Sequence, residues 1–145
     1  MSHIKLIITG LFLFCLTSTL IFTQSAKGPK FEFEVKNNHI QLDTMYLSDL
    51  DDEVNLEVKF TNTGNKPLIV TEVSGCCGTH IKGWTQQPIF PDKQGVIKVF
   101  FRVSPKVHHI SRTVTARSND PDGAKTLKIE GVVAEKKEDG LLQPK

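Results

Sequence analysis

Residues 54–60 read VNLEVKF, and this stretch decides the fold expected for the chain. Apolar side chains stand at positions 54, 56, 58 and 60, and polar or charged side chains stand between them. An alternation with a period of two is typical of a β-strand that buries one face and exposes the other. The stretch therefore predicts a strand on the surface of a hydrophobic core.

The same period recurs on both sides of this strand, and turn-forming residues separate the segments. We expect Val54, Leu56, Val58 and Phe60 to be buried on one sheet, with Ile97, Val99 and Phe101 facing them. No stretch after residue 26 shows a sustained helical period. About seven strands in some 100 residues predict an all-β fold, an immunoglobulin-like antiparallel β-sandwich over residues 27–133. The expected further strands are Phe31–Val35, Ile40–Leu42, Leu68–Val73, Ile97–Val103, Val114–Arg117 and Leu127–Val133.

Both ends of the chain differ from this pattern. Lys5 precedes an uncharged, mostly apolar run over residues 6–22, and small or polar residues follow it. This order predicts a signal peptide over residues 1–26, cleaved rather than retained as a membrane anchor. We therefore expect export to the periplasm or cell envelope, with no stable membrane span after cleavage. Residues 134–145 are highly charged and predict a disordered tail.

Charge and motifs narrow the class of function. The formal net charge is only +2, and the 18 basic residues are interspersed with the 16 acidic residues. Without a basic stripe, nucleic acid is not an expected partner. The chain contains no Gly-x-Ser-x-Gly elbow, no phosphate-binding glycine loop and no His-Glu-x-x-His helix motif. We therefore expect a protein that is not an enzyme and that needs no cofactor.

The most distinctive local feature is a pair of adjacent cysteines, Cys76 and Cys77, followed closely by His80 and Trp84. These four residues are the candidate binding site, and we expect the two cysteines, which Gly75 and Gly78 bracket, to lie on a tight loop at the end of the sandwich. Thiolates with an imidazole suit copper or zinc, so Cys76, Cys77 and His80 are candidate metal ligands. A structural zinc site, however, has four ligands at recognisable spacing, which this pair does not provide. A vicinal disulfide, an intermolecular disulfide and free thiols therefore remain open.

Three segments together resemble one bacterial family. They are residues 60–70 (FTNTGNKPLIV), 74–79 (SGCCGT) and 89–99 (IFPDKQGVIKV). In this order they are similar to an exported family known as domain of unknown function 1573, over residues 54–133. The resemblance implies export and a sandwich like those of sperm-protein and pilus-chaperone domains, and it implies no established activity. The chain departs from the family pattern in two places, the adjacent cysteines in place of Cys-Gly-Cys-Thr and Asp92 in place of glycine.

These observations favour an exported, non-catalytic binding or assembly module with a protein partner in the envelope or on the surface. Sandwich domains of this size bind through strand edges or through the loops at one end. The first alternative is a copper or zinc handling protein that uses the Cys76, Cys77 and His80 cluster. The second alternative is a thiol-redox protein, although the chain has no Cys-x-x-Cys motif.

Overall fold

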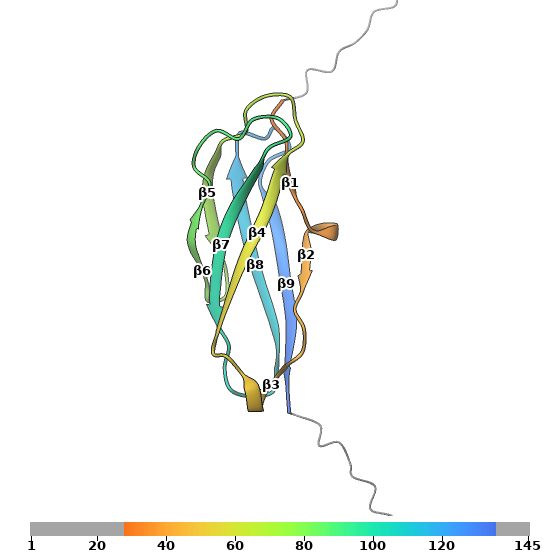
Figure 1. Ribbon diagram of the computed structural model, residues 1–145, viewed down its shortest axis with the longest axis vertical. Coiled ribbons are helices and arrows are strands. Elements are labelled where there is room, and N and C mark those ends of the chain that lie inside the picture. The colour runs from red at the N-terminus through yellow and green to blue at the C-terminus, as the bar shows by residue number, and fades with distance from the viewer. Residues whose placement is uncertain (1–27, 136–145) are drawn as a thin grey trace, which may run out of the picture.

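Two β-sheets packed face to face form from residues 28–135, the part of the chain that the computed structural model describes (Figure 1). The first sheet has the order β1 (Phe31–Phe33), β4 (Glu53–Asn62), β7 (Gln94–Arg102), β6 (Thr79–Trp84). The second sheet has the order β2 (His39–Gln41), β9 (Lys125–Ala134), β8 (His108–Ser118), β5 (Val70–Gly75), and β3 (Met45–Tyr46) also pairs with β9. The predicted all-β sandwich is confirmed, whereas its immunoglobulin-like connections stay a prediction.

The N-terminal segment contributes to both sheets. β1 pairs with β4 in the first sheet, and β2 and β3 then pair with β9 in the second. A single turn of 3-10 helix, Lys36–Asn38, makes this change, with Asn37 and Asn38 at positive φ. Asparagine tolerates that backbone conformation better than most residues. β2 and β3 run parallel to β9, whereas every other strand pair in the described chain is antiparallel.

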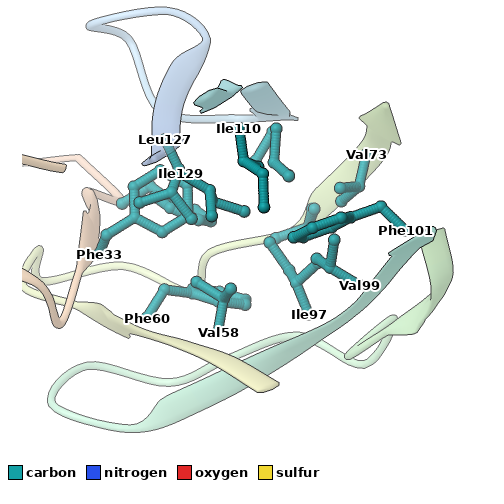
Figure 2. Close-up of a cluster of buried hydrophobic side chains, with 14 of the residues drawn as sticks. Phe33, Val58, Phe60, Val73, Ile97, Val99, Phe101, Ile110, Leu127 and Ile129 are labelled. Carbon is teal, nitrogen blue, oxygen red and sulfur yellow. The ribbon is translucent and has the colours of Figure 1, made fainter. Parts of the chain in front are cut away.

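The core lies between the sheets and takes alternate residues from each long strand (Figure 2). Val58 and Phe60 are buried as predicted, but Val54 and Leu56 are only half-buried. Ile97 and Val99 do not face β4 from the opposite sheet, because β7 is the direct neighbour of β4 and Val58 pairs with Ile97. Alternation shows which face of a strand is buried, but it does not show which sheet the strand joins. The facing residues come from the second sheet and include Ile110, Val114, Leu127 and Ile129.

β9 ends at Ala134, so the last strand reaches the first position of the segment predicted as a tail. The predicted signal peptide, residues 1–26, and tail positions 136–145 lie outside the described residues. Over residues 28–135, no helix has the length and apolar character needed to cross a bilayer.

Candidate functional site

The two cysteines lie in the short turn that connects β5 to β6. The main-chain N–H of Thr79 donates to the carbonyl oxygen of Cys76 at 3.0 Å, which closes a four-residue turn. The two central residues, Cys77 and Gly78, have φ values of 60° and 82°. Positive φ at both central positions is the pattern of a type I′ turn. The expectation of a tight loop at this position is confirmed, and the loop joins an edge strand of one sheet to an edge strand of the other.

The two bracketing glycines have different roles in this turn. Gly78 is needed for its positive φ, as expected. Gly75 does not have positive φ, but a Cβ atom there would lie 2.5 Å from the carbonyl oxygen of Thr79. Gly75 therefore permits a close approach of two main chains where the strands diverge toward separate sheets. The second left-handed residue of the turn is Cys77 itself.

The thiols of Cys76 and Cys77 are exposed, and their Sγ atoms lie 2.8 Å apart. A hydrogen bond from the Cys77 thiol lowers the pKa of Cys76, and contacts with Thr113 and the charge of Arg112 lower it further. The same contact raises the pKa of Cys77, because a hydrogen bond to an ionised Cys76, and the charge of that thiolate, favour the neutral form of Cys77. Cys76 is therefore the first of the two thiols to ionise.

The other two predicted site residues lie apart from the thiol pair. The His80 ring stacks on Phe100, with centroids 4.9 Å apart and planes inclined by 21°. The half-buried Trp84 packs against the core, and its indole N–H points to the carbonyl oxygen of Val70 at 3.4 Å. Among residues 28–135, no three His, Cys, Asp or Glu side chains gather closely enough to hold a metal ion. The copper or zinc site stays a prediction, and the geometry brings together only its two sulfurs.

β8 continues beyond the end of β5 and is left with an open edge over residues 108–112 (Figure 1). β5 ends opposite Val114, and the last main-chain hydrogen bond on this side joins the N–H of Cys76 to the oxygen of Thr113 at 3.0 Å. Main-chain groups point to the same side at every second residue of a strand. The main-chain groups of His109 and Ser111 therefore point away from β9, to the side of β8 that β5 covers only farther along the strand. Both residues are exposed. Within the described chain, no main-chain group bonds to them there.

β4 also continues past its neighbour, because β1 pairs with it only over residues 60–62, and the uncovered part of β4 carries the acidic residues Glu53 and Glu57. The other sheet edges are short or irregular. β1, β2 and β3 have only three, three and two residues. β5 has an irregular register between Val70 and Glu72, and β6 has one between Ile81 and Gly83. Short strands, bulges and charged side chains are the usual protection of an edge against pairing with another chain. The open edge of β8 belongs to a long, regular strand.

Arg112 is the last residue of the open edge, and its positive charge has no acidic partner among the described residues. Its guanidinium lies over the ring of Phe101, 5.5 Å from the centroid. Its Nε atom is buried and has no hydrogen-bond partner in the described chain, and the same holds for Oγ1 of Thr79 in the nearby turn. None of the ion pairs among the described residues includes Arg112. A carboxylate from outside would pair with this charge through the terminal nitrogens of the guanidinium, because Nε itself is buried.

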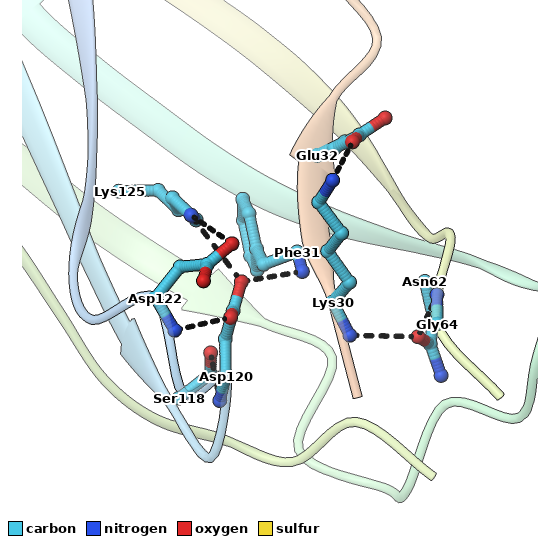
Figure 3. Close-up of polar contacts among 9 residues, drawn as sticks. All are labelled: Lys30, Phe31, Glu32, Asn62, Gly64, Ser118, Asp120, Asp122 and Lys125. Carbon is cyan, nitrogen blue, oxygen red and sulfur yellow. Dashed lines mark hydrogen bonds and ion pairs between the residues drawn. The ribbon is translucent and has the colours of Figure 1, made fainter. Parts of the chain in front are cut away.

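Two buried polar side chains organise the loops at the other end of the sandwich (Figure 3). The Asn62 amide oxygen accepts hydrogen bonds from the N–H groups of Lys30 at 3.2 Å and Gly64 at 3.0 Å. Its amide nitrogen donates to the carbonyl oxygens of Lys66 and Ile89, both at 2.8 Å. The first motif of the family resemblance thus contains a buried side-chain amide whose oxygen and nitrogen both have hydrogen-bond partners. The composition of the motif had indicated only a turn.

Asp120 has the same role in the turn between β8 and β9. Its carboxylate accepts hydrogen bonds from the N–H groups of Phe31 at 2.9 Å and Asp122 at 2.8 Å, and it pairs with Lys125 at 3.4 Å. Burial by itself raises the pKa of this carboxyl, but these donors outweigh the burial and hold the pKa below its ordinary value. A pocket of about 360 Å³ lies beside Asp120. Asp120 thus holds these segments together, a role that the sequence pattern did not reveal.

The third motif, residues 89–99, is also hydrogen-bonded to Asn62. The N–H of Asp92 donates to the carbonyl oxygen of Asn62 at 2.9 Å, and Asp92 has a φ of 60°. Glycine adopts this left-handed conformation without strain, and Asp is one of the few other residues that tolerate it. Asp92 is therefore compatible with a turn at which the resemblance led us to expect glycine.

Comparison with solved structures shows the fold alone. The chain is similar to a protein of unknown function from Porphyromonas gingivalis W83, at 14% identity and a TM-score of 0.58, covering 79% of this chain and 51% of that one. It is also similar to the secreted serine protease VesC from Vibrio cholerae, at 10% identity and a TM-score of 0.54, covering 73% of this chain and 23% of that one. The chain thus spans about half of the first protein and a quarter of the second. No curated protein gives a significant match.

The family model described as "Protein of unknown function (DUF1573)" matches residues 31–133, from the first residue of β1 to the penultimate residue of β9. The match includes all three motifs, the cysteine turn and both buried polar side chains. The resemblance inferred from those motifs is thereby confirmed, and the chain belongs to the DUF1573 family.

Proposed function

We propose that this chain is an exported, non-catalytic binding module of the periplasm or cell envelope. Its partner is a protein that adds an extended, acidic segment to the open edge of β8. The observation that supports this proposal is the row of main-chain groups at His109 and Ser111, which face no other strand of the described chain. An added strand satisfies such groups with main-chain hydrogen bonds, and its side chains supply specificity.

The position of the edge defines how the segment binds. The bound segment continues the line of β5 past the cysteine turn and runs antiparallel to β8, as β5 does. An acidic residue in the segment then reaches the guanidinium of Arg112, which forms no ion pair within the described chain. Lys106 and His109 are exposed at the other end of the edge and add to its basic character. We therefore expect binding to weaken as salt concentration rises.

A proline substitution tests the edge directly. The N–H of Ser111 points away from β9, so Ser111→Pro removes a donor of the open edge and keeps the β8–β9 hydrogen bonds. Ser111→Ala is the matched control, because it removes the hydroxyl and keeps the N–H. We expect acidic peptides selected from a library of extended ten-residue peptides to bind the parent chain and the alanine variant equally. Ser111→Pro should lower their affinity at least about tenfold, which corresponds to about 1.4 kcal/mol.

Two readouts accompany the affinity measurement. The melting temperatures of both variants report whether the sandwich is intact, and hydrogen exchange reports whether the amides of His109 and Ser111 become protected on binding. If a folded Ser111→Pro variant binds as tightly as the parent chain, or if protection appears on another strand, the proposed edge is wrong.

Export has a separate test. The proposal requires a mature N-terminus between Gln24 and Lys27, which intact-mass measurement of the protein from an envelope fraction detects. An uncleaved chain in the cytoplasm would contradict this part of the proposal and would leave the edge-binding experiment valid.

A further inference from the structure

The requirements of the turn do not explain the cysteine at position 77. Cys77 has a φ of 60°, a conformation that costs a residue with a side chain about 1–2 kcal/mol. Asn, Asp and Gly are the residues that favour a type I′ turn at this position. Packing does not explain the cysteine either, because both thiols are exposed. A strained residue that neither the turn nor the core requires points to a chemical role for its side chain.

The local geometry places this thiol against a second thiol. Cys76 is fixed on one side by its hydrogen bond to Thr113 and on the other by the turn that Thr79 closes. The left-handed conformation of Cys77 then brings the two Sγ atoms to 2.8 Å. Arg112 adds a positive charge beside the pair. A positive charge and a neighbouring thiol are features of reactive cysteines.

We propose that Cys76 and Cys77 form a thiol–disulfide exchange site for disulfides of small thiols such as oxidised glutathione. Cys76 is the attacking residue and Cys77 is the resolving residue. The site does not depend on the binding of a partner strand.

Exchange proceeds in two displacement steps. The Cys76 thiolate attacks one sulfur of the oxidised small thiol, a mixed disulfide forms, and the other half leaves as a thiolate. Cys77 then loses its proton to water and attacks Sγ of Cys76, which expels the second small thiolate. The two cysteines are oxidised to a vicinal disulfide, and one disulfide of the small thiol is reduced to two thiols. The two sulfurs lie 2.8 Å apart, and the contacts of Cys76 with Thr113, which stabilise its thiolate, favour this order of attack.

A metal site at the same position agrees less well with the geometry. Only two sulfurs lie together, and no third His, Cys, Asp or Glu of the described chain joins them. Structural zinc sites need four ligands. Disulfide formation needs only the two sulfurs that are present.

The experiment uses the chain with Cys15→Ser, so that Cys76 and Cys77 are its only thiols. The protein is equilibrated with reduced and oxidised glutathione at graded ratios, free thiols are alkylated, and the intact mass is measured. The parent pair should lose two hydrogens and retain no glutathione. Cys77→Ser should accumulate one glutathionyl group on Cys76. In the parent chain, acid quenching at early times should trap the first glutathionyl group on Cys76 rather than on Cys77, which peptide mapping distinguishes.

Two outcomes would overturn the proposal. One is a parent chain that accumulates two glutathionyl groups, or remains a dithiol at ratios that oxidise a dithiol peptide of the same sequence. The other is a first glutathionyl group that is trapped on Cys77 rather than on Cys76 in the parent chain. Both positions are exposed, and circular dichroism checks that each variant is folded. Ser111→Pro should exchange normally, so a failure of edge binding and a failure of thiol exchange are distinguishable.

Discussion

The carboxylate of Asp120 accepts a hydrogen bond from the main-chain N–H of Phe31 at 2.9 Å, which ties the turn between β8 and β9 to the first strand of the opposite sheet. The two residues are 89 positions apart in the chain. Asn62 makes a similar connection between the β4–β5 loop and Ile89 at 2.8 Å. The loops at this end are thus joined by buried polar side chains, in addition to the apolar residues Leu68 and Ile89 that they contribute to the core.

Removing the Asp120 carboxylate should destabilise the sandwich. Asp120→Ala leaves the buried N–H of Phe31 without an acceptor, and each such loss costs about 1–3 kcal/mol. Asp122→Ala is the control, because its carboxylate is exposed and only approaches Lys125 at 3.8 Å. Urea unfolding should show a lower free energy for the first variant and a nearly unchanged value for the second. Equal stability of the two variants would contradict the structural role of Asp120.

The same carboxylate predicts a dependence of stability on pH. The folded state holds the pKa of Asp120 below its ordinary value of 3.8. The ionised form therefore contributes stability that is complete above that value and is lost as pH falls through the lowered pKa. Unfolding free energies between neutral pH and about pH 3 should decline less steeply for Asp120→Asn than for the parent chain. Parallel curves would show that the folded state does not favour the charged form.

Asn62 should not tolerate a carboxylate of the same shape. Asn62→Asp replaces the nitrogen that donates to Lys66 and Ile89 by an oxygen, which places two acceptors against two carbonyl oxygens. We expect a loss of several kcal/mol, because the new oxygen would be buried without a donor and would carry negative charge against two carbonyl oxygens. Asn65→Asp, at an exposed position of the same loop, is the control and should melt close to the parent temperature. A folded Asn62→Asp variant with the parent melting temperature would rule out this network.

Cys77 should be replaceable with a gain in stability. Asn tolerates the left-handed conformation that Cys77 has, and Asn followed by Gly is a preferred pair in a type I′ turn. Cys77→Asn should therefore raise the unfolding free energy by about 0.5–1 kcal/mol. Cys76→Ser, at a position without positive φ, should change it little. A destabilised Cys77→Asn variant would mean that the thiol contact itself supports the turn.

The strands with the strongest alternation were predicted from the sequence, but two strands were not. β6 was missed because its register shifts between Ile81 and Gly83, which interrupts the period of two. β3 has only two residues, too few to show a period. The parallel pairing of β2 with β9 joins residues such as Ile40 and Ile129, which lie far apart in the sequence. Local patterns do not contain that information.

The candidate site was predicted in part. Adjacent cysteines between glycines correctly indicated an exposed turn, because turn chemistry is local. The position of His80 was not predictable, since it depends on Phe100 from another strand. Asn62 and Asp120 resemble ordinary turn residues in composition, and their burial depends on partners as distant as Phe31. The open edge of β8 became visible only when the end of β5 was known.

The division of the N-terminal segment between two sheets affects the order in which the domain can assemble. β2 and β3 have β9 as their partner, the last strand to leave the ribosome or an export channel. Until β9 arrives, the early strands have only part of their pairing, and closing such long loops is slow. The sandwich therefore cannot form strand by strand as the chain emerges. The proposed export of an unfolded chain is compatible with this order of assembly, because the sandwich is incomplete until β9 is available.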